Sequence, residues 1–167
     1  MKAKATIFML FVVLLGCRKD TGPNVILNGA LTDCTANSTC AYNYYDNAGF
    51  TSGNQFINGS YRVFWYKSTN VNACGPTSQF YFKTPMNYDT FDINSDQIAA
   101  GQIVAYDMRC PCCYVANVEI PIGGEIKGKR RDSNHWLINA TIILGVSASE
   151  PVDTIVVNQY FASEKLP

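Results

Sequence analysis

Apolar and polar residues alternate with a period of two over much of the C-terminal third of the chain. From 117 to 129 one face is apolar and the other charged, with Val118, Ile120, Ile122 and Ile126 against Glu119, Glu125, Lys127 and Lys129. This pattern predicts a strand with one face in water. The residues at 131–134 are typical of a turn, and the returning strand at 135–145 has an inward face of Trp136, Ile138, Ala140, Ile142 and Leu144. A second turn at 147–151 and a strand at 153–161 complete a predicted three-stranded antiparallel meander.

Shorter strand-like runs precede the meander. They lie at 25–31, 41–45, 61–67, 79–83 and 102–108, with Gly, Asn and Pro in the gaps between them. One short helix is expected near 95–100, with Asn94 or Ser95 as its N-cap and Gly101 as its stop. The pattern predicts an all-β fold, a single antiparallel β-sandwich of about 8 strands over residues 25–167. A closed β-barrel is the alternative.

The first residues of the chain have a different character. Lys2 and Lys4 precede an apolar run at 5–16. A helix needs about 20 apolar residues to span a bilayer, so this run is too short. A basic start, a short apolar stretch and small residues at its end are typical of a secretory signal peptide, here residues 1–16.

The end of this run, Leu14-Leu15-Gly16-Cys17, resembles the lipobox of bacterial lipoproteins. The resemblance implies that cleavage follows Gly16, that Cys17 receives a diacylglyceryl thioether, and that its new amino group is acylated by a fatty acid such as palmitate. Two or more acyl chains anchor a protein stably to a membrane. Arg18 and Lys19, not an aspartate, follow the cysteine, so we expect an outer-membrane lipoprotein of the cell envelope, either periplasmic or surface-exposed.

Composition limits the partners of the mature chain. Of the 13 lysines and arginines, Lys2 and Lys4 lie in the leader, which leaves 11 against 13 aspartates and glutamates. A nucleic-acid binder usually has a basic face and a high pI, so no nucleic-acid partner is expected. Residues 17–24 are predicted to be a lipidated tether, and the remaining residues are enough for one domain with a core of its own.

The chain has seven cysteines, and lipidation of Cys17 leaves an even number. An even number in an oxidising envelope favours disulfides. The six are Cys34, Cys40, Cys74, Cys110, Cys112 and Cys113. A bond between the adjacent Cys112 and Cys113 would be strained, which leaves two attractive arrangements. The first pairs Cys34 with Cys40, Cys110 with Cys113, and Cys74 with Cys112; in the second, the three clustered cysteines all pair with the other three.

The clustered thiols also suggest a thiol redox or metal-handling lipoprotein. Cys110 and Cys113 have the Cys-x-x-Cys spacing of thioredoxin-like sites, but such sites need a following helix, and here the next residues alternate like a strand. A structural zinc site needs a second pair of ligands, and His135 is the one histidine in the chain. We therefore expect no metal and no cofactor.

Two aromatic clusters, at 42–47 and 61–66, are the strongest indication of a ligand. Aromatic faces stack on sugar rings, and neighbouring amides and carboxylates bond hydroxyl groups. Tyr42, Tyr44 and Trp65 are the candidate ligand-binding residues. The alternative is that these aromatic side chains fill the core.

Charged residues suggest two further sites. Lys127, Lys129 and Arg131 share one strand face, which either deters edge-to-edge pairing or binds an acidic glycan or phosphate. Carboxylates such as Asp89, Asp92 and Asp107 could serve a polysaccharide-acting hydrolase, although no spacing pairs them.

No catalytic motif is recognised in the chain, and no catalytic residue is assigned. The leading hypothesis is a non-enzymatic binding or structural accessory protein of the envelope, with a glycan or an envelope protein as its partner. The hydrolase and the thiol protein are the alternatives.

Overall fold

The computed structural model describes residues 22–27, 29–51, 55–72, 74–112 and 118–166, and these form an all-β fold with one short helix. The predicted fold class is confirmed. The strands are β1 (Ser38–Phe50), β2 (Phe56–Asn58), β3 (Tyr61–Asn70), β4 (Thr77–Pro85), β5 (Thr90–Ile93), β6 (Val104–Arg109), β7 (Ile120–Arg130), β8 (His135–Ser147) and β9 (Glu150–Ser163). The helix is α1 (Ser95–Ala99).

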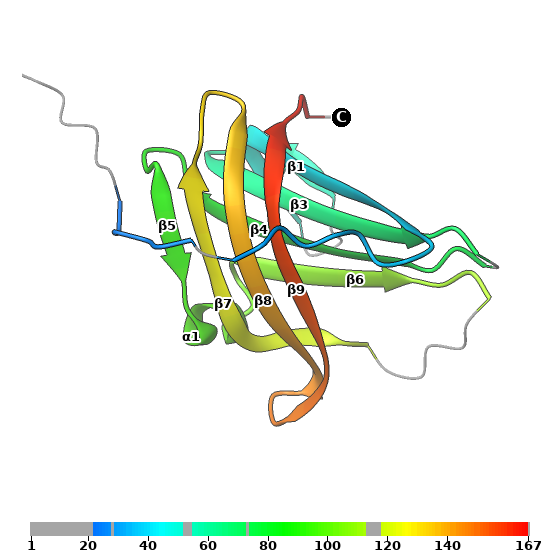
Figure 1. Ribbon diagram of the computed structural model, residues 1–167. Helices are drawn as coiled ribbons and strands as arrows, with labels where there is room; N and C mark the ends of the chain where they lie inside the picture. The colour runs from blue at the N-terminus through cyan, green and yellow to red at the C-terminus, as the bar shows by residue number, and fades with distance from the viewer. Residues whose placement is uncertain (1–21, 28, 52–54, 73, 113–117, 167) are drawn as a thin grey trace, which may run out of the picture.

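All nine strands belong to one sheet that doubles over on itself. Its order is β5-β7-β8-β9-β1-β3-β4-β6, with β2 paired to β1. The link between the two halves is a short parallel pairing of Asn43 with Ala162 and Tyr44 with Ser163. In Figure 1, β7, β8 and β9 run steeply in front of β1, β3, β4 and β6, which cross behind them. The sheet is not closed, because β5 and β6 remain its two ends, so the halves form a sandwich and not a closed barrel.

The predicted C-terminal meander is confirmed as β7, β8 and β9. Trp136, Ile138, Ala140, Ile142 and Leu144 are all buried on the inner face of β8. The orientation predicted for the start of β7 is wrong, since Val118 and Ile120 are exposed while Ile126 is fully buried. The reason is an irregularity in the pairing with β8 between Pro121 and Gly123, which breaks the alternation of faces.

Most of the upstream predictions are also confirmed. The runs at 41–45, 61–67 and 79–83 lie within β1, β3 and β4, and most of 102–108 forms β6. Asn94 caps α1, because its side chain accepts a hydrogen bond from the Gln97 N–H while the Gln97 side chain accepts one from the Asn94 N–H. β2 and β5 were not predicted because each is too short to show a period.

The strand predicted at 25–31 is wrong. The described residues of this run, with their neighbours, form an extended segment that crosses the outer face of β7, β8 and β9 (Figure 1). We call residues 22–27 and 29–32 the strap. At one end Thr90 donates a hydrogen bond to the carbonyl of Pro23, and at the other the Asn158 side chain donates to the carbonyls of Gly29 and Ala30. An apolar run thus covers the sheet without joining it.

Aromatic rings from both halves fill the space between the layers. Phe64 of β3 stacks on Phe82 of β4 at 4.8 Å between centroids and meets Trp136 of β8 edge-on at 5.5 Å. Among these rings lies the guanidinium group of Arg62, 4.7 Å from the Trp136 ring and ion-paired to Asp46. The core therefore holds a buried cation as well as apolar side chains.

Two disulfides join described cysteines. Cys34 bonds Cys40 at the start of β1, and Cys74 bonds Cys112, which ties the turn between β3 and β4 to the end of β6. Both bridges belong to the first of the two predicted arrangements. The second arrangement, in which Cys34 and Cys40 each pair with a clustered cysteine, is wrong because Cys34 and Cys40 bond each other. Cys110 is also disulfide-bonded, while Cys17 and Cys113 lie outside the described residues.

Candidate functional site

The structure does not bring Tyr42, Tyr44 and Trp65 together. Tyr44 is only 2 % exposed and its hydroxyl donates to the carbonyl of Ser133 at 3.2 Å. Tyr42 shares the inner face with Tyr44 and is partly buried against the core. Trp65 pairs with Asn43, so it lies on the opposite, outer face of the sheet. Trp65 is partly buried, as Tyr42 is, but of the three it is the one on the outer face.

Trp65 belongs to a second, smaller aromatic cluster on the outer face of β1, β3 and β4. We call this the outer cluster; its members are Tyr45, Phe50, Phe56, Trp65 and Tyr81. The Phe56 ring lies over the others, 4.8 Å from Tyr45 and 5.3 Å from Tyr81. The sequence holds a signal for it, because the unbroken apolar runs of β3 and β4 are typical of strands that are buried on both faces.

Burial in the outer cluster also changes the acidity of its phenols. Burial raises the pKa of Tyr81 to about 12, and the nearby charge of Asp107 adds to the effect. Burial raises the pKa of Tyr45 as well, with the charge of Glu164 adding to it. Both hydroxyl groups are therefore neutral at physiological pH.

A chain of polar contacts holds the Trp65 ring in place. Its indole N–H donates to the side-chain oxygen of Gln79 at 3.2 Å. The Gln79 amide in turn donates to Asp107 at 2.9 Å, and Arg109 donates to the same carboxylate oxygen at 2.9 Å. The Lys67 ammonium lies over the same ring, 5.9 Å from its centroid. The ring is thus fixed from neighbouring strands before any ligand arrives.

A shallow hollow of about 220 Å³ lies beside this ring. Its lining residues are Thr39, Cys40, Ala41, Trp65, Lys67 and Thr69. It combines part of an indole ring, two threonine hydroxyl groups and an ammonium group that only donates. We call it the Trp65 hollow.

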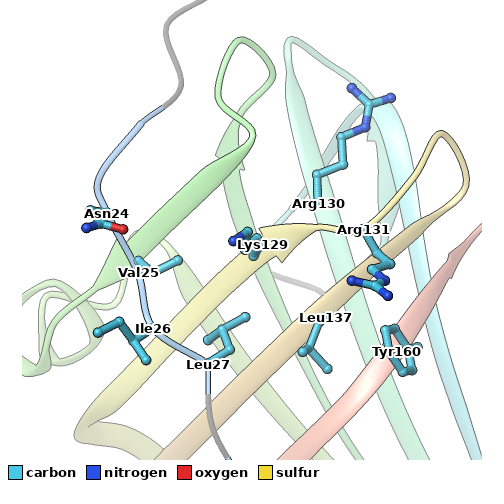
Figure 2. A pocket seen from close by; sticks show the side chains of 9 residues that line it. All are labelled: Asn24, Val25, Ile26, Leu27, Lys129, Arg130, Arg131, Leu137 and Tyr160. Carbon is cyan, nitrogen blue, oxygen red and sulfur yellow. The ribbon is translucent and has the colours of Figure 1, made fainter.

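A second, larger pocket lies between the strap and the outer face of the other layer (Figure 2). It has a volume of about 550 Å³ and is lined by Asn24, Val25, Ile26, Leu27, Lys129, Arg130, Arg131, Leu137 and Tyr160. We call it the strap pocket. The basic residues of this pocket were predicted from the sequence. The opposite wall was not, because it consists of strap residues that the sequence predicts as a strand.

The cations around the strap pocket differ in their partners. Lys127, outside the pocket, pairs with Glu125 at 2.7 Å, which raises its pKa. Arg130 turns away from the pocket in Figure 2 and pairs with Asp89 at 3.4 Å. Within the described part of the chain, no carboxylate lies within ion-pairing distance of Lys129 or Arg131. Two unpaired positive charges therefore remain at the pocket.

The three candidate carboxylates of a hydrolase point in different directions. Asp89 is engaged with Arg130. Asp92 is exposed and lies on the face of β5 opposite the buried Phe91, whereas Asp107 bonds Gln79 on the outer face of the other layer. Asp92 and Asp107 thus face away from each other on the two sides of the sandwich.

The described residues were also compared with the requirements of a metal site and of a membrane-spanning helix. In the ranges that the structure describes, no group of three or more His, Cys, Asp or Glu residues is placed to hold a metal ion. Among the same residues, no helix is long and apolar enough to cross a membrane.

No family model, curated protein or solved structure matches the chain.

Proposed function

We propose that this chain is a lipid-anchored protein of the cell envelope, held on the outer membrane through Cys17, whose β-sandwich domain binds a glycan without transforming it. The lipobox-like leader and the disulfides both fit an oxidising compartment outside the cytoplasm. The glycan assignment depends on one observation, the immobilised Trp65 ring at the edge of the Trp65 hollow.

The fixed ring favours binding for a physical reason. A ligand that orders a side chain loses part of its binding energy to the lost side-chain entropy. The link from Trp65 through Gln79 to Asp107 has already ordered the indole, so stacking of a sugar on its face costs little more. Thr39 can then bond a hydroxyl group of that sugar, and Lys67 can bond a hydroxyl or an acidic substituent. The Thr69 hydroxyl already shares a hydrogen bond with that of Thr77 at 3.1 Å, so it adds at most one further contact.

A binding role is favoured over the hydrolase for a geometric reason. Glycosidases place two carboxyl groups within about 10 Å of each other across the scissile bond. Asp92 and Asp107 lie on opposite outer faces, and Asp89 is engaged with Arg130. These side chains do not supply the acid and base that such a reaction needs.

The anchor is tested with Cys17→Ser. Cells that express the natural chain are expected to incorporate radioactive palmitate into it and to retain it in the outer-membrane fraction. The Cys17→Ser chain is expected to lose both label and membrane retention. Retention of the label by Cys17→Ser would contradict the proposal.

The glycan site is tested on an array of neutral and uronic-acid oligosaccharides. Loss of the stacking ring in Trp65→Ala is expected to weaken binding about tenfold, since an aromatic contact contributes about 0.5–1.5 kcal/mol beyond the area that it buries. Trp65→Phe is expected to retain part of the affinity. Tyr61→Ala is the matched control, because Tyr61 is an exposed aromatic residue on the same strand and face. Equal losses in Trp65→Ala and Tyr61→Ala, or no binding to any oligosaccharide, would contradict the assignment.

A further inference from the structure

The strap pocket has the composition of an anion site with an apolar base. Lys129 and the guanidinium of Arg131 approach it from the end of β7, and Tyr160 adds a phenol from β9 (Figure 2). Leu137 and the strap residue Leu27 supply its apolar surface. A guanidinium fork with an ammonium group beside it is a common arrangement for phosphate binding.

The nearest carboxylate in the sequence, among the residues that the structure describes, makes no ion pair with these cations. Asp132 follows Arg131 directly, but it accepts a hydrogen bond from the backbone N–H of Asn134 at 2.7 Å and contacts the His135 ring at 3.0 Å. These contacts lower the pKa of Asp132. The mature chain carries more acidic than basic residues, so the charge at the pocket is a local feature and not a property of the whole surface.

Exposed apolar side chains also lie on this face of the domain. Ile26 of the strap is 73 % exposed and Val156 of β9 is 58 % exposed. Leu31, also in the strap, is exposed as well. Basic groups next to exposed aliphatic side chains are typical of surfaces that lie against an anionic membrane.

The strap also sets how far the pocket can lie from the lipid anchor. Five Cα–Cα steps lead from Cys17 to Gly22, and a fully extended chain covers at most about 3.6 Å per step, or roughly 18 Å in all. The contact of Pro23 with Thr90 holds the strap to β5 directly after Gly22. Lipidation at Cys17 would therefore keep this face of the domain close to the bilayer surface.

We propose that the strap pocket binds the phosphate of an anionic phospholipid headgroup in the membrane that anchors the chain. Lys129 and Arg131 bond the phosphate oxygens, and Ile26 and Val156 enter the boundary between headgroups and acyl chains. The outer face of β7, β8 and β9 then rests on the membrane, and the Trp65 hollow on the opposite layer faces away from it. This inference rests on the proposed lipid anchor.

The test uses the mature chain with Cys17→Ser, which lacks lipid and keeps every described strand and core residue. Its binding is measured by co-sedimentation with vesicles of phosphatidylglycerol and phosphatidylcholine and with vesicles of phosphatidylcholine alone. We expect binding to the anionic vesicles only. Because each cation near an anionic surface contributes a factor of about five, Lys129→Ala/Arg131→Ala is expected to reduce the partition coefficient roughly 25-fold.

Lys83→Ala/Arg109→Ala is the matched control, since it removes the same charge from the outer face of the other layer. Its binding is expected to stay within about twofold of that of the Cys17→Ser chain. Equal losses in the two double variants, or equal binding to both vesicles, would overturn the proposal. Inorganic phosphate at constant ionic strength competes for Lys129 and Arg131, so it is expected to weaken binding to the anionic vesicles. The assay is independent of lipidation, so a failure here is distinct from a failure of the palmitate experiment.

Discussion

Arg62 is a buried cation, and its surroundings predict an unusual ranking of variants. Its side chain is 4 % exposed, while that of its partner Asp46 is 40 % exposed. Two N–H groups of Arg62 donate to the two carboxylate oxygens of Asp46 at 2.6 and 3.1 Å. The guanidinium carbon also lies 4.7 Å from the centroid of the Trp136 ring.

The two ends of this ion pair are not equivalent. Asp46→Ala leaves the cation buried without its carboxylate, a change that costs about 3–5 kcal/mol in fully buried pairs. Because Asp46 is partly in water and the Trp136 ring still faces the cation, we expect a cost of about 2–3 kcal/mol. Arg62→Met instead removes the charge from the core, fills a similar volume and lets Asp46 return to water. Its expected cost is about 1 kcal/mol, mostly the lost cation–π contact.

The assay is urea unfolding at pH 7 with the disulfides intact, followed by the fluorescence of Trp136 and Trp65 and by circular dichroism. Asp46→Ala is expected to lower the free energy of unfolding more than Arg62→Met does. The double variant is expected to resemble Arg62→Met, since a chain without the cation no longer needs the carboxylate. Additive losses in the double variant, or a larger loss in Arg62→Met than in Asp46→Ala, would refute this reasoning.

Three further predictions concern stability. A Cβ atom at Gly128 would overlap the Phe91 ring, so Gly128→Ala is expected to cost about 1–3 kcal/mol in urea unfolding, whereas Gly49→Ala, whose Cβ would lie 3.5 Å from Ile57, should be nearly neutral. Burial raises the pKa of Tyr81 to about 12 in the fold, against about 10 in the unfolded chain. The contribution of its neutral phenol to the free energy of unfolding is therefore complete below pH 10 and is lost between pH 10 and 12. Urea midpoints at pH 8 and pH 11 should show a fall that Tyr81→Phe reduces, and an equal fall in both chains would count against burial as the cause. The Cys74–Cys112 and Cys34–Cys40 bridges span 38 and 6 residues. Chain entropy therefore predicts losses of about 4 kcal/mol for Cys74→Ser/Cys112→Ser and about 2 kcal/mol for Cys34→Ser/Cys40→Ser, and the reverse order would contradict it.

The parts of the fold that local patterns determine were predictable. β8 shows a clean period of two from Trp136 to Leu144, because one of its faces is buried over that stretch. α1 was predictable because its capping residues Asn94 and Gln97 are three positions apart in the sequence and bond each other. Signals of this kind lie within a few residues, so a single sequence contains them.

The parts that depend on distant contacts were not predictable. The parallel link between β1 and β9 joins Tyr44 to Ser163, and no local pattern reports which strands meet at that distance. The strap is apolar like a strand, but it covers the sheet because Thr90 and Asn158 bind its two ends. The outer position of Trp65 follows from its register with Asn43, which the alternation within β3 alone does not reveal.

The proposed anchoring at Cys17 matters most, because it would place the domain in the envelope and bring the strap pocket to the membrane. The most direct measurement is the mass of the N-terminal peptide of the chain isolated from outer membranes. We predict that this peptide begins at Cys17 and carries a diacylglyceryl group and an amide-linked fatty acid. A peptide with an unmodified Cys17, or one that begins at another residue, would contradict the account.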